Sequence, residues 1–133
     1  LSRGTQLNMA GYDTLGACIF AGFGFGAVPG VIRDLLNARY GWQVDDGILQ
    51  ELGMETIRLE REFNRRAGFT AADDTLPARL FEPFADGPAK GVHVDRDAFE
   101  AGKMLYYEMA GWDPRTGNPT AATLKKLSLD WLL

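Results

Sequence analysis

The chain has 133 residues and a net charge of -4 at pH 7. This length is enough for the core of one domain. The hydrophobic fraction of 46% and charged fraction of 24% exclude wholesale disorder. The negative charge argues against a basic nucleic-acid surface and against a polybasic membrane patch.

The only cysteine is Cys18, which excludes an intrachain disulfide framework. It equally excludes a Cys-rich zinc site, or an iron–sulfur cluster held by this chain alone, because such a cluster needs about four thiolates. No secretory signal is evident, so we expect a cytoplasmic protein. The first methionine is Met9, and we therefore expect a piece of a longer polypeptide.

Between Asp13 and Arg33 the sequence carries no charged side chain. This length suits a membrane-spanning helix. Five glycines and Pro29 interrupt it, however, and no cluster of Lys or Arg flanks it. A buried segment that other parts of the protein approach closely is the favoured interpretation, because glycine lets backbones or a ligand come near.

Two helices are predicted next. Residues 31–40 have helical spacing of apolar side chains, and Gly41 follows as a C-cap. Asp45 or Asp46 caps the longest helix, which runs to about Ala67 and is stopped by Gly68. Its expected apolar stripe consists of Ile48, Leu49, Leu52, Leu59 and Phe63.

The second half of the chain alternates between loop and helix. Residues 69–94 lose periodicity and are predicted to form a long irregular loop. Asp97 and Glu100 suggest a capping box for a helix that ends at Gly111. After a turn over residues 113–119, Thr120 caps a last helix through Leu124, Leu127 and Leu129. We therefore predict an all-α, multihelical orthogonal or bundle-like fold, a single domain over residues 1–133.

The segment GFGFGA at residues 22–27 matches the pattern G-x-G-x-x-[GA] of dinucleotide-binding proteins, with Asp45 and Asp46 about twenty residues later. That fingerprint requires a strand before it and a helix that starts inside it. Pro29 and Gly30 break the helix start, so close packing around small residues is the favoured interpretation.

Cys18 and Asp13 have two interpretations each. A lone cysteine among apolar residues is most often a small buried hydrophobic side chain; the alternative is one thiolate contributed to a shared site. Asp13 suits a helix N-cap, or a carboxylate that accepts hydrogen bonds from the N–H groups of a ligand, with Gly16 allowing close approach.

Other polar residues carry weaker indications. Arg58, Arg61 and Arg65 share a face of the long helix, which is typical of a solvated face and alternatively of docking to an anion. His93 lies in a turn without neighbouring ligands, so a metal role is disfavoured. No Ser-His-Asp constellation and no P-loop is present in the sequence.

Several ordered motifs resemble the C-terminal part of the aldehyde ferredoxin oxidoreductase family. The segment DTLGACIF at residues 13–20 is similar to the family's D-x-x-G-L-C motif, and RLEREFNRRAG at residues 58–68 to its arginine-rich helix. DTLPAR at residues 74–79 resembles its D-x-L-P-x-R loop. The similarity continues from Tyr106 to Leu129, so it covers about residues 12–130.

The resemblance implies a tungsten or molybdenum enzyme that oxidises aldehydes to carboxylates. The metal is carried by two pterin dithiolenes, and electrons pass through a [4Fe–4S] cluster to ferredoxin. By this resemblance Cys18 is the fourth cluster ligand and lies against a pterin, Asp13 binds that pterin, and Ala17 and Ile19 contact it. Ala17 stands where the family usually has Leu, which loosens packing on the pterin if that contact is made by the side chain.

The resemblance also implies what is missing. The family's other three cluster cysteines and its proposed catalytic acid and histidine lie in earlier domains, so no catalytic residue is expected in this chain. We expect it to be the C-terminal part of a larger enzyme, inactive alone and holding no stable cofactor, with the remaining domains and ferredoxin as partners. The alternative is a non-catalytic helical interaction module derived from that fold. A weaker alternative is a dinucleotide binder, which a strand before Gly22 would support.

Overall fold

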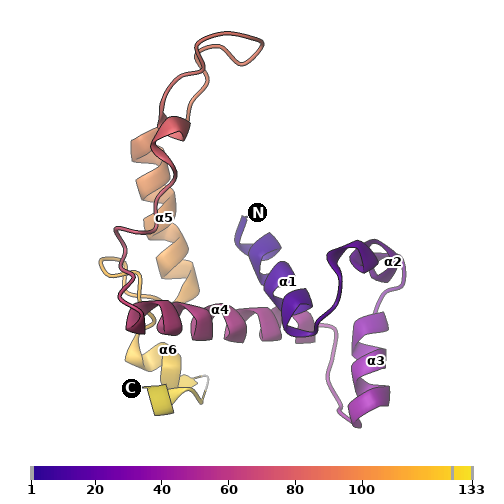
Figure 1. Cartoon of the computed structure of the whole chain (residues 1–133). Coiled ribbons are helices and arrows are strands. Elements are labelled where there is room, and N and C mark those ends of the chain that lie inside the picture. The colour runs from indigo at the N-terminus through magenta and orange to yellow at the C-terminus, as the bar shows by residue number, and fades with distance from the viewer. Residues whose placement is uncertain (1, 127, 133) are drawn as a thin grey trace. The chain divides into compact units, whose positions relative to one another are not determined.

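A computed structural model describes residues 2–126 and 128–132 of the chain (Figure 1). The chain divides into two compact units, Leu1–Glu60 and Arg61–Leu133. The described residues form α-helices and 3₁₀ turns and no strand. An isolated β-bridge pairs Trp112 with Pro119. The predicted all-α class is confirmed, whereas the assignment of residues 1–133 to a single domain stays a prediction.

The first unit begins with helix α1 (Ser2–Thr14), followed by a 3₁₀ turn (Ile19–Ala21) and the short helix α2 (Gly22–Gly26). Helix α3 (Val31–Tyr40) has the predicted bounds and ends at Gly41, whose φ of 67° places it in the left-handed region. Helix α4 (Ile48–Arg66) follows and continues into the second unit. The Asp45 carboxylate accepts the backbone N–H of Gly47 in the turn before α4. The helix begins directly after Gly47, so neither of the predicted capping residues, Asp45 or Asp46, occupies the N-cap position.

Helix α1 was not predicted from the sequence. Its packing against α4 depends on two glycines, Gly11 on α1 and Gly53 on α4. A Cβ atom on Gly53 would collide with the backbone carbonyl oxygen of Leu7, and one on Gly11 with that of Leu49. The two helix backbones therefore touch directly, and the hydroxyls of Thr14 and Thr56 extend this contact at a distance of 2.6 Å.

The buried face of α4 differs from the predicted stripe. Gly53 and Ile57 are buried, and so are Arg61 and Glu62. Phe63, predicted to be part of the stripe, is exposed. The two charges can be buried because each has an opposite charge beside it.

The second unit contains the end of α4, a 3₁₀ turn (Ala78–Phe81), helix α5 (Arg96–Ala110), helix α6 (Ala121–Lys126) and a 3₁₀ turn (Asp130–Leu132). Residues 69–94 are otherwise irregular, as predicted. The helices of the second unit pack around a small set of buried side chains: Tyr107, Ala110, Trp112, Leu124 and Leu129.

The caps of α5 and α6 confirm some predictions and correct others. The predicted capping residue Asp97 is wrong: the Asp95 carboxylate accepts the N–H of Ala98, so α5 begins two residues earlier. The predicted end at Gly111 is confirmed, with a φ of 73°. Thr120 caps α6 through the N–H of Thr123.

The last helix is shorter than predicted. It ends at Lys126, and Leu129 is buried beyond its end. Leu127, the remaining member of the predicted apolar set, lies outside the described residues.

The uncharged stretch after Asp13 is not buried in this chain. Phe20 and Phe23 are 77% and 79% exposed, so the expectation of a buried segment is wrong for this chain. In the described ranges no single helix is long and apolar enough to cross a membrane. The pair Ile19–Gly26 and Val31–Tyr40 together has the length and composition of a membrane span, but the two segments are bent by 107° relative to each other.

Candidate functional site around Cys18

A tight turn at the end of α1 sets the position of Cys18. Gly16, with a φ of 65°, donates its N–H to the carbonyl of Asp13, and Ala17 donates to the carbonyl of Tyr12. These two bonds form a Schellman motif, which uses glycine because its left-handed backbone carries no Cβ penalty. The motif ends α1 and turns the chain so that Cys18 follows two residues later.

Cys18 is the N-cap of the 3₁₀ turn Ile19–Ala21, with extended backbone at φ -62° and ψ 131°. Its carbonyl accepts the N–H of Ala21, and its thiol is exposed. The interpretation of Cys18 as a small buried hydrophobic side chain is therefore wrong for this chain. An exposed thiol in a fixed backbone position is free to ligate a group supplied from outside.

Asp13 lies in the last turn of α1 and is exposed. This position excludes the N-cap interpretation, because an N-cap precedes a helix. A carboxylate near a helix C-terminus also meets the negative end of the helix dipole, which is unfavourable. Among the described residues no hydrogen bond uses its side chain, so the carboxylate oxygens are available to an external donor.

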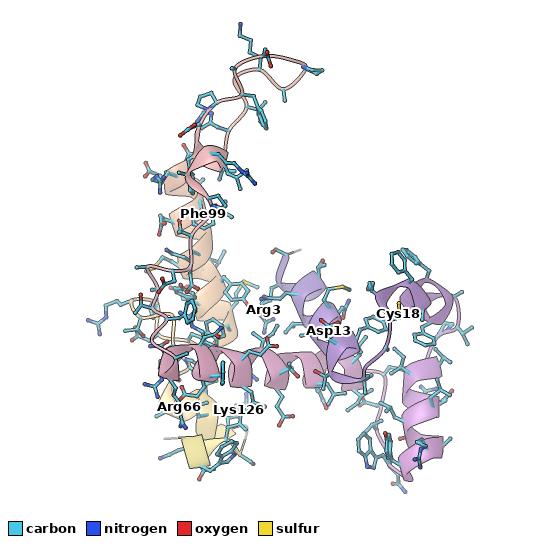
Figure 2. All side chains as sticks on the ribbon, in the orientation of Figure 1. Arg3, Asp13, Cys18, Arg66, Phe99 and Lys126 are labelled. Carbon is cyan, nitrogen blue, oxygen red and sulfur yellow. The ribbon has the colours of Figure 1, made fainter. Side chains whose placement is uncertain are left out.

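The four residues that the resemblance singles out lie within seven positions around the Schellman turn. Ala17 is half-buried, whereas Asp13, Cys18 and Ile19 are exposed. Figure 2 shows Asp13 on α1 and Cys18 on the segment that leads to α2.

Tyr12 fixes α2 beside this turn. Its ring stacks on Phe25 with centroids 6.4 Å apart, and Gly22 faces it, since a Cβ there would lie 3.5 Å from Tyr12 Cζ. Phe20 and Phe23, their rings 6.5 Å apart, stay exposed on the same segment. The site is thus an exposed thiol and carboxylate bordered by exposed aromatic side chains.

The other possible metal ligands among the described residues are not grouped into a site. Within residues 2–126 and 128–132, no group of three or more His, Cys, Asp and Glu side chains is arranged to hold a metal ion. His93 is exposed, and its Nδ1 lies 3.1 Å from the Gly91 carbonyl oxygen. Cys18 alone therefore offers one thiolate to a cluster that needs about four.

The dinucleotide-binding alternative fails on its structural requirement. The residues directly before Gly22 form the 3₁₀ turn Ile19–Ala21, where the fingerprint needs a strand. The helix that follows, α2, has only five residues.

The second unit contains a buried charge cluster that was not predicted from the sequence. Arg61 is 7% exposed, which contradicts the expectation of a solvated arginine face at this position. Its Nε donates to the carbonyl of Gly117 at 2.7 Å, and its Nη1 donates to Asp74 Oδ1 at 2.8 Å. Arg61 Nη2 lies 2.7 Å from Asp74 Oδ2. Asp74 is thirteen residues away, so helical spacing gives no indication of this pair.

Tyr107 completes the cluster. Its hydroxyl donates to Asp74 Oδ2 at 2.5 Å, and the guanidinium of Arg61 lies 5.4 Å from the centre of the Trp112 ring. Burial raises the pKa of the Tyr107 phenol well above its usual value, and the hydrogen bond to the Asp74 carboxylate raises it further. The cluster joins α4, the irregular loop, α5 and the turn before α6, so its role is to hold the second unit together.

The comparisons with known proteins agree with the motif resemblance. The sequence profile for domains 2 and 3 of aldehyde ferredoxin oxidoreductase matches residues 2–129. The chain belongs to the aldehyde ferredoxin oxidoreductase family. It is 43% identical over 104 residues, 75% of its length, to the tungsten-containing aldehyde ferredoxin oxidoreductase of Pyrococcus furiosus, and 39% identical over 122 residues, 89% of its length, to that of Pyrococcus abyssi.

A further relative carries a different name. The chain is 30% identical over 132 residues, 93% of its length, to the WOR-like subunit of an aliphatic sulfonate oxidoreductase from Pyrococcus furiosus. It spans only 16%, 19% and 20% of the lengths of these three relatives. The family membership therefore concerns a segment that is short compared with the relatives.

Proposed function

We propose that this chain is the C-terminal cofactor-contact segment of a tungsten- or molybdenum-dependent oxidoreductase that converts aldehydes to carboxylates. In this proposal Cys18 is the fourth thiolate ligand of a [4Fe–4S] cluster. Asp13 hydrogen-bonds a pterin, and Ala17 and Ile19 contact it. The observation that carries the proposal is the exposed thiol of Cys18. The Schellman turn at Gly16 holds it just after the exposed carboxylate of Asp13.

The donor chemistry of these residues fits the two groups. A thiolate is the usual protein ligand of iron in iron–sulfur clusters. An ionised carboxylate only accepts hydrogen bonds, so Asp13 suits the N–H groups of a pterin ring. When bound, the pterin-held metal supplies the oxidation chemistry and the cluster carries the electrons away.

The residues of this chain orient and shield these groups. Gly16 gives the backbone room to approach a flat ring, because it adds no side chain and nothing lies within 4 Å of its Cβ position. The exposed side chains of Ile19, Phe20 and Phe23 supply an apolar border. Covered by another domain, this border excludes water from the cluster, which helps set its potential.

The remaining three cysteine ligands and the catalytic residues come from other parts of the proposed larger protein, whose electron acceptor is ferredoxin. Relatives with aldehyde and with sulfonate in their names align with this same segment. The choice of substrate therefore belongs to those other parts. A C-x2-C-x3-C run elsewhere in the same polypeptide supports this proposal, and its absence supports a non-catalytic helical module.

Anaerobic reconstitution with iron and sulfide tests the claim that the chain alone cannot hold a cluster. We expect the isolated chain to acquire no stoichiometric chromophore near 400 nm, because it offers one thiolate. A stoichiometric chromophore of this kind on the isolated chain would contradict the proposal.

A further inference from the structure

Tyr12 holds the segment that carries Cys18 at two points. Its backbone carbonyl accepts the N–H of Ala17 at 2.9 Å, directly before Cys18. Its ring stacks on Phe25 of α2, with an angle of 9° between the two ring planes. The same ring faces Gly22, because a Cβ there would lie 3.5 Å from Tyr12 Cζ. Cys18 therefore lies between two attachments to one residue of α1.

The backbone between these two attachments is short and hydrogen-bonded. The carbonyl of Cys18 accepts the N–H of Ala21 at 2.9 Å. Gly22 donates its N–H to the carbonyl of Ile19. These bonds close the 3₁₀ turn between Cys18 and α2, so a displacement of α2 from the Tyr12 ring would also displace Cys18.

The exposure of the segment shows what supports it. All of residues 18–26 are exposed except Gly22 and Phe25, which are half-buried. These two are the residues that contact the ring of Tyr12, which is itself half-buried. The places where the segment is shielded from solvent thus coincide with the places where it meets this ring.

We propose that Tyr12 is a positioning residue for the Cys18 thiolate, because its ring fixes the segment in the geometry in which Cys18 ligates the iron–sulfur cluster. The inference rests on the proposed function, in which Cys18 is a cluster ligand. A thiol that is already held in its binding position loses less conformational entropy when it binds. Groups that orient a metal ligand also tune the metal, and their substitution typically costs about 10–100-fold in metal affinity.

The ring of Tyr12, and not its hydroxyl, carries this role. Among the described residues no hydrogen bond uses the hydroxyl, whereas the ring contacts both Phe25 and Gly22. Phenylalanine at position 12 keeps the ring and removes only the hydroxyl. Leucine at this position stays apolar but removes the aromatic stack. The two substitutions therefore separate the ring from the hydroxyl.

Iron chelation and an EPR-monitored redox titration of the full-length protein test this proposal. We expect Tyr12→Leu to lose iron to an excess of a strong chelator about 10-fold faster than the parent protein. We also expect the midpoint potential of its [4Fe–4S] cluster to shift to more positive values. A loosened segment admits water, which stabilises the reduced cluster because that state carries more negative charge. Tyr12→Phe should keep the parent rate and the parent potential.

A second pair of variants acts from the other side of the same contact. Gly22→Val places two methyl groups near the Tyr12 ring, and they cannot both turn away from it. Gly24→Val, on the same helix, is the matched control, because nothing lies within 4 Å of its Cβ position. We expect the faster iron loss and the potential shift from Gly22→Val alone. This pair leaves Tyr12 in place, so it decides the question if Tyr12→Leu does not fold.

Three results would overturn the proposal. A folded Tyr12→Leu protein with the parent rate of iron loss and the parent potential would show that the ring does not position Cys18. A Tyr12→Phe protein that behaves like Tyr12→Leu would assign the effect to the hydroxyl. Equal effects of Gly22→Val and Gly24→Val would show that the contact with the ring is not what matters.

Failure of the proposed function reads out separately, in the Cys18→Ala protein. If this protein keeps the EPR spectrum and the iron content of the parent, the proposed function and the role of Tyr12 both fail. If Cys18→Ala loses the signal while Tyr12→Leu behaves like the parent, only the positioning role of Tyr12 fails.

Discussion

Tyr107, in the last turn of α5, donates a 2.5 Å hydrogen bond to the carboxylate of Asp74, which lies in the irregular loop after α4. The same carboxylate faces the buried guanidinium of Arg61 at two points. One carboxylate thus ties a helix, a loop and a second helix together, where apolar side chains would usually do so. Arg61 is buried because Asp74 is present, and the pair needs both partners.

Replacing Asp74 by Asn removes the negative charge and leaves the Arg61 guanidinium buried without a counter-ion. Breaking a buried pair costs about 3–5 kcal/mol, and we expect about 2–3 kcal/mol here because the Asp74 side chain is partly exposed. Urea denaturation followed by the fluorescence of the buried Trp112 measures this loss.

Asp73→Asn is the matched control, since that neighbouring carboxylate is exposed and accepts hydrogen bonds from the backbone N–H and the hydroxyl of Thr70. We expect it to cost no more than about 1 kcal/mol. Equal effects of the two substitutions would show that the buried pair does not stabilise the second unit.

The raised pKa of Tyr107 predicts a loss of stability at alkaline pH. An unfolded tyrosine titrates near pH 10, whereas the folded Tyr107 keeps its proton to higher pH because of burial and the Asp74 carboxylate. The contribution of Tyr107 is therefore fully present below about pH 10 and falls as the pH rises above that value.

Tyr107→Phe removes this titration together with the hydrogen bond. The free energy of unfolding of this variant should lie below that of the parent chain at pH 8, and the difference should narrow between about pH 10 and pH 12. Denaturation curves across that range measure it. A difference that stays constant with pH would contradict the assignment of the alkaline loss to Tyr107.

The close approach of α1 and α4 predicts a strong effect of a single methyl group. Gly53→Ala places a Cβ against the backbone carbonyl of Leu7, which cannot move aside as a flexible side chain does. We expect a loss of about 1–3 kcal/mol, or more if the helices separate.

Gly102→Ala, on α5, is the control for this substitution. Nothing lies within 4 Å of the new methyl group there, and alanine favours helix by up to about 1 kcal/mol over glycine. Thermal unfolding of both variants should shift in opposite directions. A Gly53→Ala variant as stable as the parent would show that the two helix backbones are not in contact.

Local signals in the sequence were sufficient for part of the fold. Glycines in the left-handed region, Gly41 and Gly111, mark helix ends that depend only on neighbouring residues, and both were predicted. Helix α1 was missed because its glycines lower helix propensity, and the reason for Gly11 is a contact with α4 that lies far along the chain. The residues next to Gly11 in the sequence carry no information about such a distant contact.

The residues of the candidate site could be predicted from the sequence, but their exposure could not. Motif resemblance pointed to Asp13 and Cys18, while composition alone favoured a buried cysteine. Exposure depends on what covers a segment, and a stretch with Phe20 and Phe23 looks the same in sequence whether its cover is this chain or another domain. Likewise, Arg61 was expected in solvent because its partner Asp74 is not at helical spacing.

The EPR spectrum of the reduced full-length protein carrying Cys18→Ala tests the central claim most directly. Ala21→Ser, in the same exposed segment, is the control. If Cys18 is a cluster ligand, its substitution abolishes or alters the [4Fe–4S] signal and lowers the iron content, whereas the control keeps both. An unchanged spectrum and iron content in the Cys18→Ala protein would contradict the proposed role of this cysteine.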